Sequence, residues 1–318
     1  MIKFLLWSLF RGDEIAAKIS NITSRIPKAD KVYLYSYWMH YGAYAIAKLN
    51  KSHRYKKAFC RAHGFDLYFE RNAMEYIPLR HYILSNLDYI FPISLDGKKY
   101  LMNKFPQYES KMMVSKLGIL GKQHEYMVYK IDSKKVKLLS ISNFNEVKRI
   151  GLIVDALSLV KECYIDWIHI GAGGTSEKES KDYANTKLQR KKNIRFEFKG
   201  YLSNSGVMNF YRNNTIDLFI NVSESEGIPV TMMEAQSFSI PIIATEVGGV
   251  SEIVNSGNGI LLSPDPSPEQ IARKIVEFSS LSSFEVGEMR KAAFESWDNY
   301  YNAEKNYTDF ITKIMESS

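Results

Sequence analysis

Residues 223–254, which read SESEGIPVTMMEAQSFSIPIIATEVGGVSEIV, carry the strongest fold signal of this chain. They predict a loop, a short helix, a buried strand and a turn at a glycine pair, and an apolar strand precedes them. Two carboxylates, Glu226 in the loop and Glu234 in the helix, lie eight positions apart. Pro229 suits the first turn of that helix, where a missing N–H costs nothing. Ligands of open α/β sheets bind at loops that follow strands, so the loop at Glu226 is a candidate site.

The chemistry of this unit fits a nucleotide sugar. The amino terminus of the helix offers free N–H groups and the positive end of a dipole to a diphosphate. Gly227 lets the backbone approach a ligand closely. Glu234, inside the helix, can accept two hydrogen bonds from a ribose diol, and Glu226 at the loop tip can face the sugar. The alternative is that both are solvated glutamates of one helix face.

The segment resembles the E-x7-E signature of the retaining glycosyltransferases of the GT-B fold, family 4, with their downstream motif P-x-I-A-T-x-V-G-G-x-x-E-I-V. The resemblance extends over about residues 32–276. It implies an α/β fold of two Rossmann-like domains that face a cleft. These are an acceptor-side domain over 1–128 and a nucleotide-sugar-binding domain over 129–299, with a terminal helix over 300–318 that returns to the first domain. The family's opening strand and glycine-rich turn have no counterpart here, so the first domain is expected to be incomplete.

The resemblance also implies which residues of this segment hold the donor. The implied set is Glu234, Gly227, Ile228, Pro229 and Val230. Retaining transfer in this fold is usually described as attack on the same face of the sugar, with the leaving phosphate taking the acceptor's proton. A general base is therefore not required.

A second candidate region runs from the end of a predicted strand into a helix and is similar to the family motif S-V-G-R-x-x-x-x-K. Lys148 occupies the lysine position, from which its ammonium can stabilise the leaving diphosphate. Asn143 stands at the arginine position and Ser142 at the glycine position, so one expected phosphate contact is absent. Arg149 is the candidate that replaces it. The alternative for Lys148 is a lysine that only opens an amphipathic helix.

Other candidates lie at the ends of predicted strands. The resemblance implies that His63 borders the donor sugar, and Arg61 is a candidate to contact phosphate or acceptor. The alternative for His63 is a satisfied core histidine. Gly171 lies in a glycine turn that is by itself a weak nucleotide signal, and the resemblance places this turn at the cleft. Tyr201 follows a Lys-Gly pair near the implied nucleobase position, where stacking and structural packing are equal alternatives.

Composition indicates a globular chain that needs no metal. Of the 318 residues, 45% are hydrophobic and 24% charged, which excludes a disordered class. Cys60 and Cys163 lie far apart without metal-ligand spacing, which favours a reducing compartment and buried thiols. The six histidines are scattered. No metal-binding pattern stands out, and the resemblance implies no cofactor and no metal, with lysine, arginine and helix dipoles neutralising the diphosphate.

The charge is concentrated in the first part of the chain. Residues 1–130 carry 21 Lys+Arg and 10 Asp+Glu, a net +11, and the remainder carries −4. This asymmetry predicts an anionic partner, and an anionic membrane or a phosphate-bearing acceptor fits better than nucleic acid, for which there is no motif. An ordinary solvated surface is the alternative. The start of the chain is apolar only over 4–10, which predicts an amphipathic or partly buried helix rather than a signal peptide or a membrane span.

Together these features predict a retaining glycosyltransferase that moves a sugar from a nucleotide diphosphate sugar to a glycan or lipid-linked acceptor in surface polysaccharide synthesis. We expect it in the cytoplasm, peripheral on the inner face of the membrane. The alternative is a non-catalytic nucleotide-sugar-binding or partner subunit of a glycosyltransferase complex. A sugar-nucleotide epimerase or a phosphorylase would need motifs that the sequence lacks.

The pattern predicts alternating strands and helices along the whole chain. The predicted strands are 31–37, 57–61, 89–92, 111–114, 137–141, 165–170, 194–199, 218–222, 240–245 and 259–262. The predicted helices are 41–49, 76–86, 149–160, 203–211, 230–238, 267–280 and 300–315.

Overall fold

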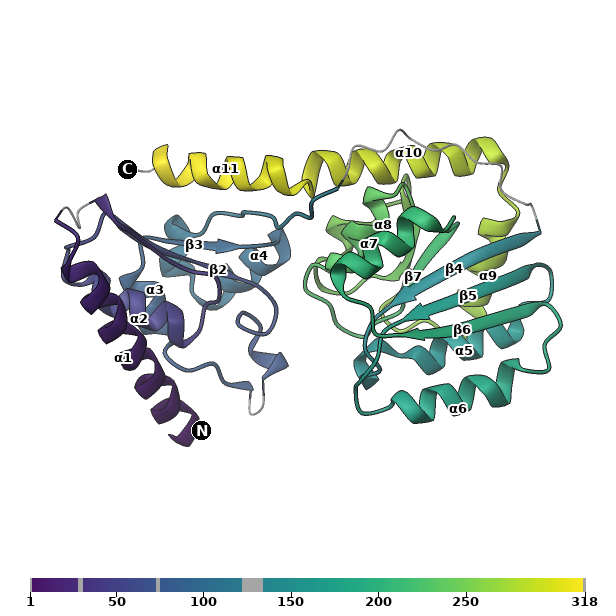
Figure 1. The fold of residues 1–318 in the computed structure, drawn as a ribbon, viewed down its shortest axis with the longest axis horizontal. Coiled ribbons are helices and arrows are strands. Elements are labelled where there is room, and N and C mark those ends of the chain that lie inside the picture. The colour runs from purple at the N-terminus through teal and green to yellow at the C-terminus, as the bar shows by residue number, and fades with distance from the viewer. Residues whose placement is uncertain (1, 28–30, 73–74, 122–133, 317–318) are drawn as a thin grey trace. The chain divides into compact units, whose positions relative to one another are not determined.

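The computed structural model describes residues 2–27, 31–72, 75–121 and 134–316. The chain divides into two compact units, each built on a parallel sheet (Figure 1). Unit 1 comprises Met1–Leu117 and Lys305–Ser318, and unit 2 comprises Gly118–Glu304. The domain boundary predicted at 128/129 lies outside the described residues.

Unit 1 is built on a three-stranded parallel sheet in the order β1-β2-β3. Its strands are β1 (Tyr33–Ser36), β2 (Lys57–Ala62) and β3 (Tyr89–Pro92). Its helices are α1 (Ile2–Ser24), α2 (Tyr41–Asn50), α3 (Arg80–Asn86), α4 (Leu95–Lys104) and most of α11 (Ala303–Glu316). Phe310 and Ile314 of α11 pack with Phe59 and Phe91 of the sheet, so the end of the chain completes an apolar cluster of the first unit.

The first helix packs through small residues, with Leu9 and Ile19 partly buried against the core, and leaves several other large apolar residues exposed. Ser8, Gly12 and Ala16 are buried, and α1 lies against α2. A Cβ added at Gly12 would lie 2.3 Å from the Tyr44 ring, so glycine permits this close approach. The most exposed apolar residues of this helix have exposed fractions of 58–70% and are Ile2, Leu6, Phe10 and Ile22. A helix that buries its small face leaves an apolar surface without a partner among the described residues.

Unit 2 is built on a six-stranded parallel sheet in the order β6-β5-β4-β7-β8-β9. Its strands are β4 (Lys135–Ile141), β5 (Tyr164–Ile170), β6 (Ile194–Gly200), β7 (Leu218–Asn221), β8 (Ile242–Thr245) and β9 (Gly259–Leu262). Its helices are α5 (Ile150–Leu159), α6 (Glu177–Leu188), α7 (Asn204–Asn213), α8 (Val230–Ser237), α9 (Pro268–Ser279) and α10 (Ser283–Tyr300). All residues of β7 and β8 are buried, as in parallel sheets covered on both faces.

The strand order places a topological switch point between β4 and β7. The chain runs outward from β4 through β5 to β6, returns to β7 on the other side of β4, and continues to β8 and β9. The loops that leave the carboxyl ends of β4 and β7 therefore diverge to opposite sides of the sheet. Open α/β sheets bind ligands at this point.

The structure confirms most predicted elements and corrects some. Strands 89–92 and 259–262 have the predicted bounds, but strand 111–114 is wrong, because this segment follows the 3-10 helix Pro106–Lys111 and makes only one bridge, from Met112 to Ile90. The helix predicted from residue 76 begins at Arg80, because Ile77 precedes a proline and Leu79 adopts a left-handed conformation with φ 64°. Helices α4, α6 and α10 were not predicted; α6 buries only two residues and gives little periodic signal. Both cysteines are buried and free.

Candidate active site

The switch point of unit 2 brings together Lys148 and Glu226. Lys148 lies in the 3-10 helix Glu146–Lys148 after β4, and Glu226 lies in the loop after β7. The Lys148 Nζ donates to Glu226 Oε1 at 2.6 Å, and the Asn221 side chain donates to the same oxygen at 3.2 Å. The side chains of the ion pair are only 24% and 10% exposed. A carboxylate and an ammonium are thus held together at the edge where ligands bind.

Backbone contacts fix the Glu226 loop between its neighbours. The Glu224 N–H donates to the Val147 carbonyl at 2.8 Å, which ties the loop to the segment that carries Lys148. On the other side, the Gly249 N–H donates to the Gly227 carbonyl at 2.9 Å. A Cβ at Gly249 would lie 2.7 Å from that carbonyl oxygen, so glycine at this position permits the approach.

The observed contacts give Arg149 a structural role. It adopts a left-handed conformation, with φ 48°, so its side chain leaves the backbone in another direction than that of Lys148. Its Nε donates to the Val222 carbonyl at 2.6 Å, and its terminal nitrogens donate to the carbonyls of Ser223 and Pro264 at 3.3 and 2.8 Å. These bonds join the loop after β7 to the loop after β9. Donor contact by Arg149 stays a prediction, and its guanidinium donates mainly to carbonyls.

Glu234 lies in α8 and is 4% exposed. The Asn204 side chain, at the start of α7, donates to Glu234 Oε1 at 2.7 Å. Burial raises the pKa of Glu234 to about 7, and the hydrogen bond from Asn204 opposes this rise. Pro229 is the N-cap, one residue before the helix, rather than its first residue. At the same end of α8, Ile228 is buried and Val230 is 42% exposed.

The loops after β4 and β5 support each other. Gly171 has φ 151°, and a Cβ there would lie 1.7 Å from the Ser142 carbonyl oxygen. The Phe144 N–H donates to the Gly173 carbonyl at 2.8 Å. Beneath these loops the His169 Nε2 lies 3.1 Å from the same Ser142 oxygen, and burial lowers the pKa of His169 to about 4. The glycine turn therefore shapes the loop before Lys148.

Two predicted donor contacts are exposed side chains at this edge of the sheet. Asn143 lies in the loop after β4, and Tyr201 directly follows β6 with 76% of its surface exposed. An exposed tyrosine is open to stacking, and no ring contact of Tyr201 is observed among the described residues. Its contact with a base stays a prediction.

His63 and Arg61 belong to unit 1. His63 is 7% exposed, and its ring lies 4.3 Å from the Trp38 ring and 3.6 Å from the Asp66 carboxylate. Its contact with a donor sugar stays a prediction. The phosphate or acceptor contact predicted for Arg61 is wrong, because Arg61 is fully buried. Its guanidinium donates to the carbonyl and the hydroxyl of Ser115 and lies 4.3 Å from the ring of Phe310.

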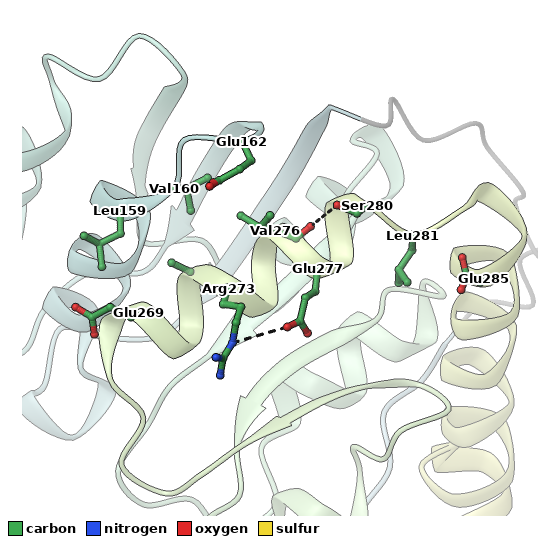
Figure 2. A pocket seen from close by; sticks show the side chains of 11 residues that line it. Leu159, Val160, Glu162, Glu269, Arg273, Val276, Glu277, Ser280, Leu281 and Glu285 are labelled. Carbon is green, nitrogen blue, oxygen red and sulfur yellow. Dashed lines mark hydrogen bonds and ion pairs between the residues drawn. The ribbon is translucent and has the colours of Figure 1, made fainter.

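One hollow of unit 2 lies away from these residues. A pocket of about 700 Å³ is formed by the end of α5, by α9 and by the start of α10 (Figure 2). Glu162, Glu269 and Glu285 lie around it, and Arg273 pairs with Glu277 at 3.8 Å within it. None of the predicted site residues lines it, so we do not assign the site there. Within the described ranges, no cluster of histidine, cysteine and acidic residues could hold a metal ion.

The family model of the glycosyl transferases group 1 matches residues 123–295, more than half of the chain. The chain belongs to this family. Its relatives include the putative colanic acid biosynthesis glycosyltransferase WcaL of Escherichia coli K12, 23% identical over 76% of this chain and 59% of the relative. Another is the O-antigen biosynthesis glycosyltransferase WbnH of Escherichia coli, 27% identical over 54% of this chain and 46% of the relative. The chain thus spans about half the length of these curated relatives.

Solved structures of glycosyltransferases share the fold of this family member. The lipopolysaccharide outer core galactosyltransferase WaaB in its apo form superposes with a TM-score of 0.74 at 18% identity, over 96% of this chain and 81% of that one. Anabaena HepE in complex with UDP and glucose gives 0.68 at 15% identity, over 94% and 80%. These identities establish the fold alone: the predicted α/β fold of the GT-B class, with two Rossmann-like domains, is confirmed.

Sequence reasoning missed two side chains of the site, Asn221 and Asn204. Asn221 ends the buried strand β7, and a polar residue at the end of an apolar run is a usable signal. Asn204 follows the N-cap Ser203 of α7, and nothing in its local sequence indicates that it contacts Glu234.

Proposed function

We propose that this chain is a retaining glycosyltransferase that transfers a sugar from a nucleotide diphosphate sugar to a glycan or lipid-linked acceptor. The observation that carries the proposal is the Lys148–Glu226 ion pair at the switch point, with Glu234 in the adjoining helix α8. Family membership supports transfer, and UDP in the structure of HepE supports a nucleotide donor.

Each charged group has a distinct task in this proposal. The Lys148 ammonium leaves its contact with Glu226 and stabilises the negative charge that develops on the diphosphate as the bond to the sugar breaks. Glu226 then accepts a hydrogen bond from a sugar hydroxyl. The first N–H groups of α8, which receive no side-chain cap, bind a phosphate. The diphosphate is neutralised by these groups without a metal.

Glu234 binds the ribose. One of its oxygens accepts from Asn204, which orients the carboxyl group within a buried site. An ionised carboxylate accepts stronger hydrogen bonds than a neutral acid. Because its pKa is about 7, the affinity for nucleotide depends on pH near neutrality.

We propose surface polysaccharide synthesis as the biological setting, because the relatives WcaL and WbnH are named for colanic acid and O-antigen biosynthesis. The basic first part of the chain and the exposed apolar face of α1 support a peripheral position on the cytoplasmic face of a membrane. Among the described residues, no helix is both long and apolar enough to cross a bilayer.

A non-catalytic subunit is the second candidate. Asn143 occupies the position of the family's arginine. The Arg149 guanidinium, the candidate to replace that arginine, donates to backbone carbonyls instead. If the protein binds nucleotide sugars but does not turn them over, the absence of the family's arginine at position 143 accounts for the missing activity.

A thermal-shift screen of nucleoside diphosphates and their sugars tests the proposal, because a ligand that binds only the native state raises the melting temperature. We expect one nucleoside diphosphate and its sugar to raise it, and release of the nucleotide from that donor to require an acceptor. No stabilisation by any of them contradicts the donor site. Stabilisation without release over long incubation identifies the non-catalytic alternative.

A further inference from the structure

Unit 1 contains an apolar pocket of about 400 Å³ that the proposed transfer has not used. It is formed by α1, by the segments that follow β1 and β2, and by the residues before α3. Its apolar lining includes Phe4, Trp7, Trp38, Phe65 and Ile77. The pocket thus lies at the carboxyl ends of two parallel strands, where open α/β sheets bind ligands.

Three of the polar side chains at this pocket, those of Asp66, Asn72 and His40, are engaged with the protein itself. The Asp66 carboxylate accepts from the Met39 N–H at 2.6 Å and from the His63 N–H at 2.7 Å. The Asn72 amide donates to two backbone carbonyls, at 2.8 and 3.0 Å. The His40 Nδ1 accepts from a backbone N–H at 3.4 Å. A sugar would find few free partners here, whereas an apolar ligand gains from leaving water.

One side of the pocket is formed by α1, which also exposes apolar side chains outside the pocket. Phe4 and Trp7 line it, and Leu6 and Phe10 of the same helix are 58% and 69% exposed. An apolar chain that enters the pocket therefore meets the apolar rings of Phe4 and Trp7 on this side. The net charge of +11 over residues 1–130 favours a ligand that also carries phosphate.

We propose that this pocket binds the hydrocarbon chain of a lipid-linked acceptor. The inference rests on the proposed sugar transfer and names the acceptor's chemical class: a sugar joined through phosphate to an alkyl or isoprenoid chain. Phe65 and Phe4 contact the chain, and the sugar remains outside the pocket.

Tryptophan fluorescence reports binding directly. Trp7 and Trp38 line the pocket and are 48% and 41% exposed, whereas Trp167 and Trp297 are buried in unit 2. The probe is n-octyl β-glucoside below its critical micelle concentration, and methyl β-glucoside carries the same sugar without the chain. We expect a saturable blue shift with the octyl compound and none with the methyl compound. Equal shifts with both, or a shift that does not saturate, would overturn the proposal.

Two exposed phenylalanines separate pocket binding from general adsorption. Phe65 lines the pocket and is 60% exposed, and Phe10 is 69% exposed but does not line it. Both substitutions are expected to leave the melting temperature unchanged. Phe65→Ala should weaken octyl glucoside binding by about tenfold, and Phe10→Ala by less than about twofold. Equal losses in both variants would assign the shift to nonspecific adsorption and refute a site.

Calorimetry with nucleoside diphosphates on the same preparation keeps the two proposals apart. Octyl glucoside binding without any nucleotide binding refutes the donor site and leaves the apolar site standing. Nucleotide binding and turnover without octyl glucoside binding refute only the apolar site. With an active donor, KM should fall as the acceptor's chain is lengthened, and Phe65→Ala should remove that dependence with kcat unchanged.

Discussion

Replacing Glu234 with glutamine removes one charge from the proposed ribose site and keeps the size of the side chain. Glu234 is 4% exposed and accepts a hydrogen bond from Asn204 at 2.7 Å. Because burial raises its pKa to about 7, about half of the ligand-free protein carries a proton on this carboxyl at neutral pH. Nucleotide binding uses the ionised form, so below pH 7 the carboxyl must first lose its proton. The affinity for nucleotide should therefore fall as the pH drops below 7.

The size of the effect follows from the bonds that are lost. A hydrogen bond to a charged group contributes about 1.5–3 kcal/mol, which corresponds to about ten- to hundredfold in affinity. We expect Glu234→Gln to weaken nucleoside diphosphate binding by that factor at pH 8. The difference from wild type should shrink at pH 6, where the wild-type carboxyl is mostly protonated.

The same pKa determines the sign of a stability effect. The folded-state pKa lies above the ordinary 4.5, so the folded protein retains a proton that the unfolded chain releases. The free energy of unfolding should therefore fall as pH rises from about 4.5 to about 7, by up to about 3 kcal/mol. Glu234→Gln should remove this decline, as urea unfolding at several pH values will show.

The assay is isothermal titration calorimetry of wild type, Glu234→Gln and Asn204→Ala between pH 6 and 8. Glu224→Gln is the matched control, because it removes the same charge from an exposed position nearby. Asn204→Ala removes a bond that lowers the pKa of Glu234, so its binding profile should move to higher pH. A folded Glu234→Gln protein with wild-type affinity and wild-type pH dependence would refute the assignment.

Four further predictions concern other parts of the chain. Lys148→Ala should lower kcat/KM by about two to three orders of magnitude, roughly 3–4 kcal/mol, because the leaving diphosphate loses its cation; near wild-type transfer in a steady-state assay would assign that task to another group. Glu226→Gln should depress turnover and leave nucleoside diphosphate affinity near normal, and calorimetry that shows both falling together would reject separate roles for the two glutamates. Gly171→Ala should destabilise unit 2 by about 1–3 kcal/mol in urea unfolding, because a Cβ would lie 1.7 Å from the Ser142 oxygen at a φ of 151°; unchanged unfolding would mean that the loop relaxes freely. The protein should co-sediment with anionic vesicles and be released by salt, and Phe10→Glu should reduce this binding, at about 1 kcal/mol for each basic residue near the surface; equal binding to neutral vesicles would contradict the electrostatic part of the argument.

Helices without a clear periodic pattern escaped prediction. Helix α6 has the sequence EKESKDYANTKL and buries only Ala184 and Leu188, so almost nothing marks an inward face. Helix α10 has a capping box at Ser282 and buries residues at helical spacing, but one of the four, Arg290, is charged, which weakens the apolar pattern. Strand 111–114 has an apolar composition that suits a strand, yet β3 offers it a single bridge. Local composition therefore misled where tertiary contacts decided the structure.

The sequence alone was sufficient for the β7–α8–β8 part of unit 2. The apolar runs, Pro229, the glycine pair and the eight-residue spacing of Glu226 and Glu234 all lie within about thirty residues. Local signals of this kind specify a strand, a loop and a helix start without any knowledge of distant contacts, because backbone conformation depends on neighbouring residues. The family resemblance added the identity of the fold, which the comparisons confirmed.

Only the tertiary structure decided which side chains meet. Lys148 and Glu226 are 78 residues apart, and they pair because β4 and β7 are neighbours in the sheet. Asn204 reaches Glu234 across 30 residues. Arg149, adjacent to Lys148 in sequence, turns to carbonyls because its backbone adopts a left-handed conformation. Spacing along the chain does not encode strand order or side-chain direction, so these partners emerge only once the sheet is assembled.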